Sequence, residues 1–147
     1  MHVLNDSEAC AFLLSSPRTA ALATVRADGR PHVAPVWFDL DGDDILFTTG
    51  KSTVKGENIQ RDPRVSLCVD DESPPFAFVL IEGDATCTED PGELLAWATR
   101  IAGRYMGAEQ AASFGRRNAV PGELLVRVRP TRLTAQSDVT GRTAVSS

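Results

Sequence analysis

The chain has 147 residues, of which 42% are hydrophobic, so it fits one folded domain and its composition does not indicate disorder. Its net charge is −5 and its basic residues form no stripe, which argues against binding nucleic acid or an anionic membrane. Three widely spaced cysteines and two histidines form neither a disulfide framework nor a metal-ligand motif. No apolar run is long enough to cross a bilayer and no secretory leader is evident, so a cytoplasmic protein is expected.

The first part of the chain predicts one helix and three strands. Residues 6–15 place apolar residues at helical spacing, and Pro17 ends the helix. Residues 19–26, 31–39 and 44–49 are predicted strands, separated by two turns that each contain Asp-Gly. Because Asp-Gly between apolar runs is the strongest short signal for a β-hairpin, these strands should form an antiparallel meander.

The rest of the chain predicts a short helix, two strands, two helices and a final strand, at residues 52–61, 65–69, 76–89, 91–106, 108–117 and 123–130. Ser52 is the expected N-cap of the short helix. About six mainly antiparallel strands with helices outside favour a barrel-like α+β domain, because closure removes exposed sheet edges. This domain should span residues 1–137, and the polar residues 138–147 should form a flexible tail.

Motifs for side-chain catalysis are absent. The sequence contains no nucleophile elbow, no zinc-protease motif, no P-loop and no dinucleotide-binding glycine motif. The adjacent acidic residues lie in predicted turns, where solvated charges are the ordinary interpretation. No catalytic residue and no metal site are therefore assigned, and either a cofactor carries the reaction or the protein catalyses none.

Residues 48–58, TTGKSTVKGEN, form the most informative cluster, because a strand ends there and a helix begins. Amide groups at a helix start attract anions, and both lysines of the chain lie in this segment. The segment therefore suits a phosphate or a phosphodiester, although a plain helix cap with solvated lysines explains the same pattern. The candidate ligands are Thr49, Lys51, Ser52, Thr53 and Lys55.

The predicted strand HVAPVWF, residues 32–38, forms a second cluster. Pro35 has no N–H to donate, so one side of this strand should be open or at a sheet edge. Such a strand could lie against a flat ring and offer it backbone groups, although its aromatic residues are also ordinary candidates for the core or for a dimer contact. The candidate ring contacts are Val33, Pro35, Val36 and Trp37.

These two clusters, in this order, resemble the pyridoxamine-phosphate-oxidase-like superfamily of split-barrel flavin-binding proteins. The resemblance is carried by residues 26–67 and above all by the phrase NIQRDPRVSL at 58–67. Residues 104–118 and 121–130 resemble the actinobacterial branch that uses the deazaflavin F-420. The resemblance implies a mainly β (α+β) fold, a six-stranded antiparallel split β-barrel with flanking helices, and a homodimer with two cofactor sites at its interface.

The resemblance also implies an activity and a binding mode. The cofactor ring is expected over residues 33–37 and its phosphate between Thr48 and Lys55, with Lys55 as the leading phosphate ligand. The expected protein is an F-420-dependent reductase that passes a hydride to an unsaturated small-molecule acceptor; an FMN-dependent oxidoreductase and a non-catalytic carrier are the alternatives. Trp37, Phe78 and Tyr105 of the partner subunit are candidates to line the acceptor pocket.

Two departures argue against pyridoxal-phosphate synthesis. The resembling oxidases carry basic residues at both ends of the ring-binding strand, where this chain has Val33 and Phe38. They also end in a motif that contains arginine and tryptophan, whereas the last residues here contain no tryptophan.

Overall fold

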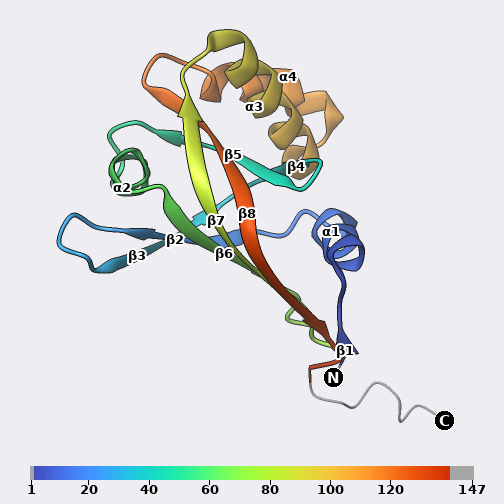
Figure 1. The fold of residues 1–147 in the computed structure, drawn as a ribbon. Coiled ribbons are helices and arrows are strands. Elements are labelled where there is room, and N and C mark those ends of the chain that lie inside the picture. Colours follow the sequence, from blue (N-terminus) through green and yellow to red (C-terminus); the bar gives the residue numbers. More distant parts are fainter. Residues whose placement is uncertain (1, 140–147) are drawn as a thin grey trace.

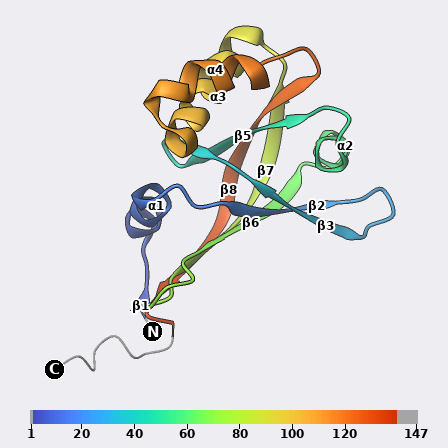
Figure 2. The same cartoon turned by 180° about the vertical axis from the view of Figure 1, so that it is seen from behind.

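A computed structural model describes residues 2–139. The elements, shown from two sides in Figures 1 and 2, are β1 (His2–Val3), α1 (Asp6–Ser15), β2 (Ala20–Val25), β3 (Pro31–Val36), β4 (Asp39–Asp41), β5 (Asp44–Gly50), α2 (Val54–Arg61), β6 (Arg64–Asp70), β7 (Phe78–Thr88), α3 (Pro91–Met106), α4 (Ala108–Asn118) and β8 (Glu123–Ser137). Residues 140–147 of the predicted tail lie outside the described residues.

The strands within residues 2–139 form one antiparallel sheet of eight strands, in the order β3-β2-β6-β7-β8-β5-β4, with β1 paired to β8. The chain passes from β3 at one end of this order to β4 at the other, so the sheet curls into a split barrel. The predicted fold class is confirmed, but the predicted number of six strands is wrong. The predicted strand 31–39 ends at Val36, and a separate short strand begins at Asp39, because residues 37–38 turn the chain from one end of the sheet to the other.

The last strand is longer than the sequence indicated. It was expected to end at Pro130, yet β8 continues to Ser137 beside β7. The register explains the difference: Gly83 pairs with Pro130 and Glu82 with Arg132, so Thr131 is an extra residue in β8. This bulge accommodates a proline that has no N–H for the ladder.

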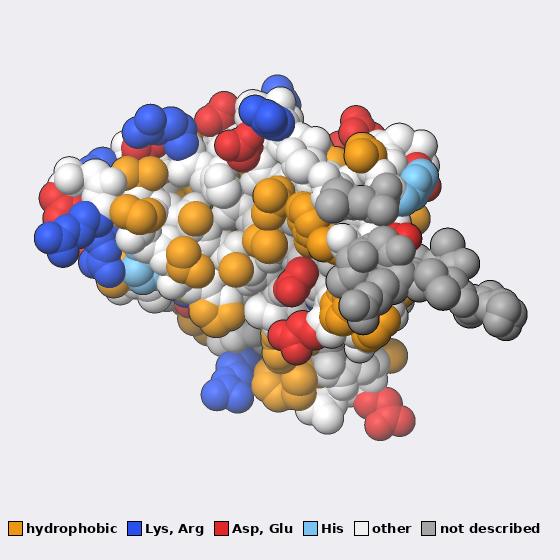
Figure 3. Space-filling model, turned by 90° about the horizontal axis from the view of Figure 1, so that it is seen from below, with side chains coloured by type: hydrophobic (Ala, Val, Ile, Leu, Met, Phe, Trp, Pro, Cys, Tyr) orange, Lys and Arg blue, Asp and Glu red, His pale blue; other side chains and the backbone are white. Residues whose placement is uncertain are grey.

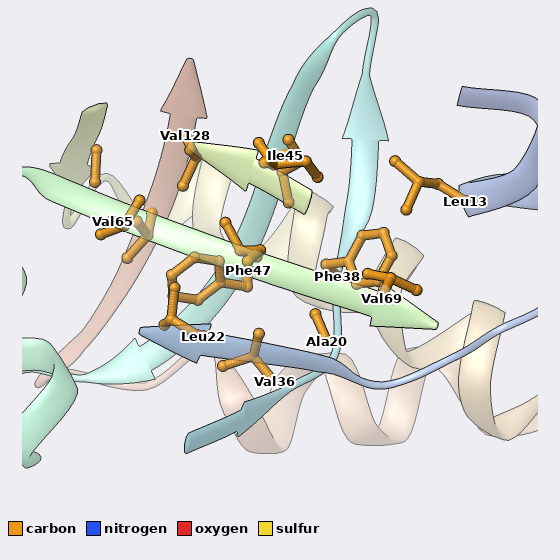
Figure 4. Close-up of a cluster of buried hydrophobic side chains, with 14 of the residues drawn as sticks. Leu13, Ala20, Leu22, Val36, Phe38, Ile45, Phe47, Val65, Val69 and Val128 are labelled. Carbon is orange, nitrogen blue, oxygen red and sulfur yellow. The ribbon is translucent and has the colours of Figure 1, made fainter. Parts of the chain in front are cut away.

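The main core lies inside the curled sheet (Figure 4). Phe38 and Phe47 fill its centre, and Leu13 of α1 closes one end. β5 is buried on both faces, because Phe47 points into this core while Leu46 joins a second cluster with Leu94 of α3. Each fully buried side chain of this size contributes about 1.5–3 kcal/mol to folding.

Helices cover only part of the barrel. In both views α3 and α4 lie together beside β4 and β5, while α2 lies between the end of β5 and the β2–β3 pair (Figures 1 and 2). Within residues 2–139, none of the helices has the length and apolar character needed to span a membrane. Among the helices of residues 2–139, none covers the face of β2, β3, β6 and β7 that carries Ala21, Val33, Ser66 and Leu80 (Figures 1 and 2).

Candidate functional site

The end of β5 and the start of α2 form a tight corner at residues 50–56. The carbonyl of Gly50 accepts hydrogen bonds from the amide of Thr53 at 3.2 Å and from its hydroxyl at 2.8 Å. The same hydroxyl accepts from the amide of Gly56 at 3.1 Å, so Thr53 is the N-cap of α2 and the prediction of Ser52 was wrong by one residue. A Cβ on Gly56 would overlap the carbonyl oxygen of Gly50, so only glycine allows this close approach.

The corner presents some of its polar groups and buries others. Thr49 is 4% exposed, and its hydroxyl lies 3.1 Å from that of Thr53, so these two groups build the corner. Ser52 is exposed, and the amides of Val54 and Lys55 open the helix, where N–H groups have no intrahelical acceptor. Ser52, these amides and the two lysines are therefore the groups best placed to meet an anion.

A glutamate accompanies each lysine of the corner. The Nζ of Lys51 lies 3.1 Å from Oε2 and 3.4 Å from Oε1 of Glu89, which follows β7. Glu123, the first residue of β8, pairs with Gly50 across the β5–β8 ladder. Burial raises the pKa of Glu123, and the nearby charge of Lys55 opposes that rise. The corner therefore holds two carboxylates that the sequence pattern did not bring to the site, because β7 and β8 reach it only through sheet pairing.

The strand β3 lies at the edge of the sheet, as Pro35 indicated, with β2 on its one paired side. The side chains of Val33 and Pro35 are exposed, whereas that of Val36 is buried in the core. Of the predicted ring contacts, Val36 can therefore offer a ligand its backbone but not its side chain.

Trp37 follows β3 and is 44% exposed, although one face of its indole is covered. The ring of Tyr105, near the end of α3, stacks on it in parallel with the centroids 4.6 Å apart. The tyrosine hydroxyl donates to the carbonyl of Arg18 at 2.7 Å and accepts from the amide of Phe38 at 3.2 Å, which fixes its ring. Burial raises the pKa of this phenol. These contacts join Trp37 and Tyr105 within one chain, whereas Phe78 lies at the start of β7.

Polar side chains of α2 connect the corner to β2, the strand that pairs with β3. Asn58 is 4% exposed, and its amide donates to the hydroxyl of buried Thr24 in β2 at 3.0 Å. Arg61 donates to the side-chain oxygen of Asn58 at 3.0 Å and to the carbonyl of Val25 at 2.6 Å. Gln60 donates to the carbonyl of Lys51 at 2.9 Å. Asn58, Gln60 and Arg61 lie in the segment 58–67 that resembles the family, but no local sequence pattern indicated these contacts, because their partners lie on other elements.

The predicted phosphate cluster (48–58) and the predicted ring cluster (32–38) are thus connected through α2 and β2. They do not line one common cavity. Val33 lines a groove of about 480 Å³ on the uncovered sheet face, together with Ala21, Ser66, Cys68 and Leu80. The groove receives no residue from the β5–α2 corner. A neighbouring groove of about 640 Å³ continues along the same face past Thr24 and Arg64. Figure 3 shows hydrophobic side chains spread over the middle of the molecule seen from this side.

The arrangement suits binding more than side-chain catalysis. The corner offers helix amides, hydroxyls and ammonium groups to an anion, and β3 offers an open strand edge to a flat group. Among residues 2–139 there is no group of three or more His, Cys, Asp and Glu side chains that could hold a metal ion. The split barrel, with its polar corner at the start of α2, is the fold of a class of proteins that hold flavin-type cofactors.

Comparison with known proteins identifies the family. The sequence pattern of the family described as pyridoxamine 5'-phosphate oxidase matches residues 6–137, so the chain belongs to this family.

Among solved structures, the conserved hypothetical protein Rv2991 from Mycobacterium tuberculosis is 28% identical with a TM-score of 0.81, and the match covers 93% of this chain and 87% of that one. An F420 reductase is 29% identical with a TM-score of 0.66, covering 84% and 94%. HutZ, the heme storage protein from Vibrio cholerae, is 18% identical with a TM-score of 0.69, covering 88% and 94%, and at that identity it shows the shared fold alone.

Proposed function

We propose that the protein is an F-420-dependent reductase that transfers a hydride from the reduced deazaflavin to an unsaturated small-molecule acceptor. The observation that carries this proposal is the β5–α2 corner, where both lysines of the chain meet the start of a helix. The likeness to an F420 reductase, at 29% identity over 84% of the chain, supports the choice of cofactor.

The residues present fit such a cofactor. Lys55, Ser52 and the first amides of α2 would hold the anionic tail, because they combine charge with unpaired donors. Thr49 and Thr53 would not contact the cofactor themselves; their hydrogen bonds would keep the corner in its conformation. The open edge of β3 would support the ring through its backbone, with Val33 and Pro35 exposed beside it.

In this proposal the cofactor and the protein chain make different contributions to the reaction. When bound, the reduced deazaflavin supplies the hydride, and the chain supplies position and a partly apolar surface. The acceptor would pack against Trp37, because this side chain is 44% exposed while Tyr105 stacks on one face of its indole and fixes its orientation. The hydroxyl of Tyr105 is already committed to the carbonyl of Arg18, so the proton that completes the reduction is assigned to solvent.

Cofactor choice can be tested by titrating the purified protein with F-420 and with FMN and following ligand fluorescence. We expect F-420 to bind more tightly. Much tighter binding of FMN would overturn the choice of cofactor and favour an FMN-dependent oxidoreductase on the same scaffold.

Turnover requires a separate measurement. Protein loaded with reduced F-420 is mixed with a panel of quinones, enones and biliverdin, and the return of the deazaflavin absorbance is followed. We expect reoxidation with at least one acceptor at a rate above that of the free cofactor. Tight binding without reoxidation across the panel would favour a carrier.

We also propose that the protein is a homodimer in which the uncovered sheet face meets a second copy. The grooves of about 480 and 640 Å³ on this face, and the exposed apolar side chains Val33 and Leu80 within the first, support this interface.

A charge on this face should separate the subunits. Leu80→Glu is expected to convert a dimer of the 15.8 kDa chain into a monomer, because a carboxylate would replace an apolar side chain in the buried interface and would have to lose its water. Leu95→Glu is the matched control, since Leu80 is 41% exposed and Leu95, on α3, is 42% exposed. Light scattering after size-exclusion chromatography measures the mass, and a monomeric wild-type protein would contradict the proposal.

A further inference from the structure

Tyr105 holds Trp37 at two points. Its ring stacks on the indole with the centroids 4.6 Å apart and the two planes 3° from parallel. Its hydroxyl accepts a hydrogen bond of 3.2 Å from the amide of Phe38, which belongs to the peptide bond that follows Trp37. The same hydroxyl donates to the carbonyl of Arg18 at 2.7 Å. One tyrosine therefore fixes both the ring of Trp37 and the backbone that carries this ring.

The residues around this aromatic pair are themselves held by several contacts. Phe38 is 1% exposed and lies in the main core (Figure 4), and the guanidinium of Arg104 lies 4.7 Å from the centre of its ring. The same guanidinium lies 5.5 Å from the centre of the Tyr105 ring and 3.6 Å from a carboxylate oxygen of Asp39. It also donates to two backbone carbonyls at the end of α1. Trp37 therefore cannot turn without breaking contacts that join α1, α3 and the start of β4.

The rest of the Trp37 side chain is exposed. Because Tyr105 covers one face of the indole, the exposed area of this 44% exposed residue lies on the opposite face and on the ring edges. Val33 and Pro35 are exposed as well, whereas Val36, between Pro35 and Trp37, is buried. Trp37 thus stands at the end of the exposed row over which the cofactor ring is proposed to lie, and an acceptor stacked on it would lie beside that ring.

A flat surface that cannot tilt distinguishes ligands by their shape. A planar conjugated ring stacks on an indole at van der Waals distance over its whole area. A puckered ring of the same size touches the indole with fewer atoms and so gains less dispersion energy. A mobile indole would tilt to meet the puckered ring, but the contacts of Tyr105 prevent this tilt.

We infer that Tyr105 is a positioning residue that makes Trp37 a flat acceptor surface, so that the protein prefers planar conjugated acceptors to puckered acceptors of equal size. This inference rests on the proposed function and names the class of acceptor. Aromatic stacking beyond simple area burial changes an equilibrium by roughly twofold to tenfold, which is the preference expected here.

The test uses two quinones with one carbon skeleton, 2-methyl-1,4-naphthoquinone and its 5,6,7,8-tetrahydro derivative, whose second ring is puckered. Binding is followed by quenching of tryptophan fluorescence in Trp97→Phe, where Trp37 is the only tryptophan left. KM and kcat for each quinone are measured in the wild-type protein with reduced F-420. The flat quinone should bind roughly twofold to tenfold more tightly and show a correspondingly lower KM.

Three variants separate the ring of Tyr105 from its hydroxyl. Trp37→Leu should raise the KM of the flat quinone to that of the puckered one. Tyr105→Phe keeps the stacked ring and removes both hydrogen bonds, so it should raise the KM of the flat quinone by about threefold at similar kcat, since preorganisation is lost. Tyr105→Leu also removes the stack and should abolish the preference. Trp97→Phe is the control, because Trp97 packs on α3 with Arg100 over its ring, and should keep it.

The outcomes separate the inference from the proposed function. Equal affinity for the two quinones, with turnover intact, would overturn the inference alone. So would a Tyr105→Phe variant that loses stability in urea but changes both KM values equally, because the tyrosine would then be purely structural. Weaker F-420 binding in Trp37→Leu would place the cofactor ring on Trp37 and contradict the inference as well. A wild-type protein that neither binds F-420 nor reduces a quinone would overturn the proposed function together with the inference.

Discussion

Replacing Lys55 by alanine is expected to weaken cofactor binding by about 1.5–3 kcal/mol, the range for a hydrogen bond to a charged group, which corresponds to roughly 10- to 150-fold in Kd. Lys55 lies in the first turn of α2, where its ammonium group and the helix amides act on the same anion. The variant also removes the positive charge that acts on Glu123, so that carboxyl group loses a nearby favourable partner. Fluorescence titration of wild-type and variant proteins with the cofactor measures the difference.

Two matched variants give this prediction its controls. Lys51→Ala should cost less than Lys55→Ala, because Lys51 is already paired with Glu89 and both groups are solvated. Lys55→Met keeps most of the side-chain stem and removes the charge, so it should behave like Lys55→Ala. Unchanged affinity in Lys55→Ala would show that the anion binds elsewhere, and a larger loss in Lys51→Ala would reverse the assignment of the two lysines.

Gly56→Ala is expected to destabilise the protein by about 1–3 kcal/mol, the usual cost of overpacking a close contact. Alanine in place of glycine within a helix normally stabilises by about 0.4–1 kcal/mol, so the sign of the effect is informative. Here the added methyl group would overlap the carbonyl of Gly50 and lie 3.0 Å from the hydroxyl of Thr53. Backbone atoms cannot rotate away as a flexible side chain can, so α2 must move off the end of β5. Urea unfolding of the variant measures the change in free energy.

Gly92→Ala provides the comparison for Gly56→Ala, because Gly92 also lies in the first turn of a helix but has only Asp90 nearby, at 3.4 Å. This control should be neutral or slightly stabilising. Gly56→Ala should also lower the affinity for the cofactor, because the shift of α2 moves the amides at its start away from the end of β5. Gly56→Ala with wild-type stability would contradict the close packing of α2 on β5.

Local patterns in the sequence were sufficient for most of the fold. The apolar spacing in residues 6–15 and 91–106 predicted α1 and α3, and the two Asp-Gly turns predicted the strands around them. Pro35 predicted the edge position of β3. These predictions hold because helix spacing, turn chemistry and the missing N–H of proline act over a few neighbouring residues.

The predicted strand ends were wrong where strands that are distant in sequence pair with each other. Pro130 indicated the end of a strand, but a bulge opposite Glu82 and Gly83 carries β8 past it. Residues 37–38 break the predicted strand 31–39, because the chain crosses there to the other end of the sheet. Neither feature has a local signal, since each depends on which residues the partner strand places opposite.

For the site, the sequence by itself determined the family resemblance and the concentration of both lysines beside the start of one helix. Only the tertiary structure decided that Glu89 and Glu123 stand next to those lysines, that Tyr105 stacks on Trp37, and that Asn58 bonds to Thr24. The physical reason is that a helix start and its charges are properties of neighbouring residues, whereas electrostatic balance is set by every charge within reach in space. Sheet register and helix packing bring those charges together from parts of the chain that are far apart in sequence.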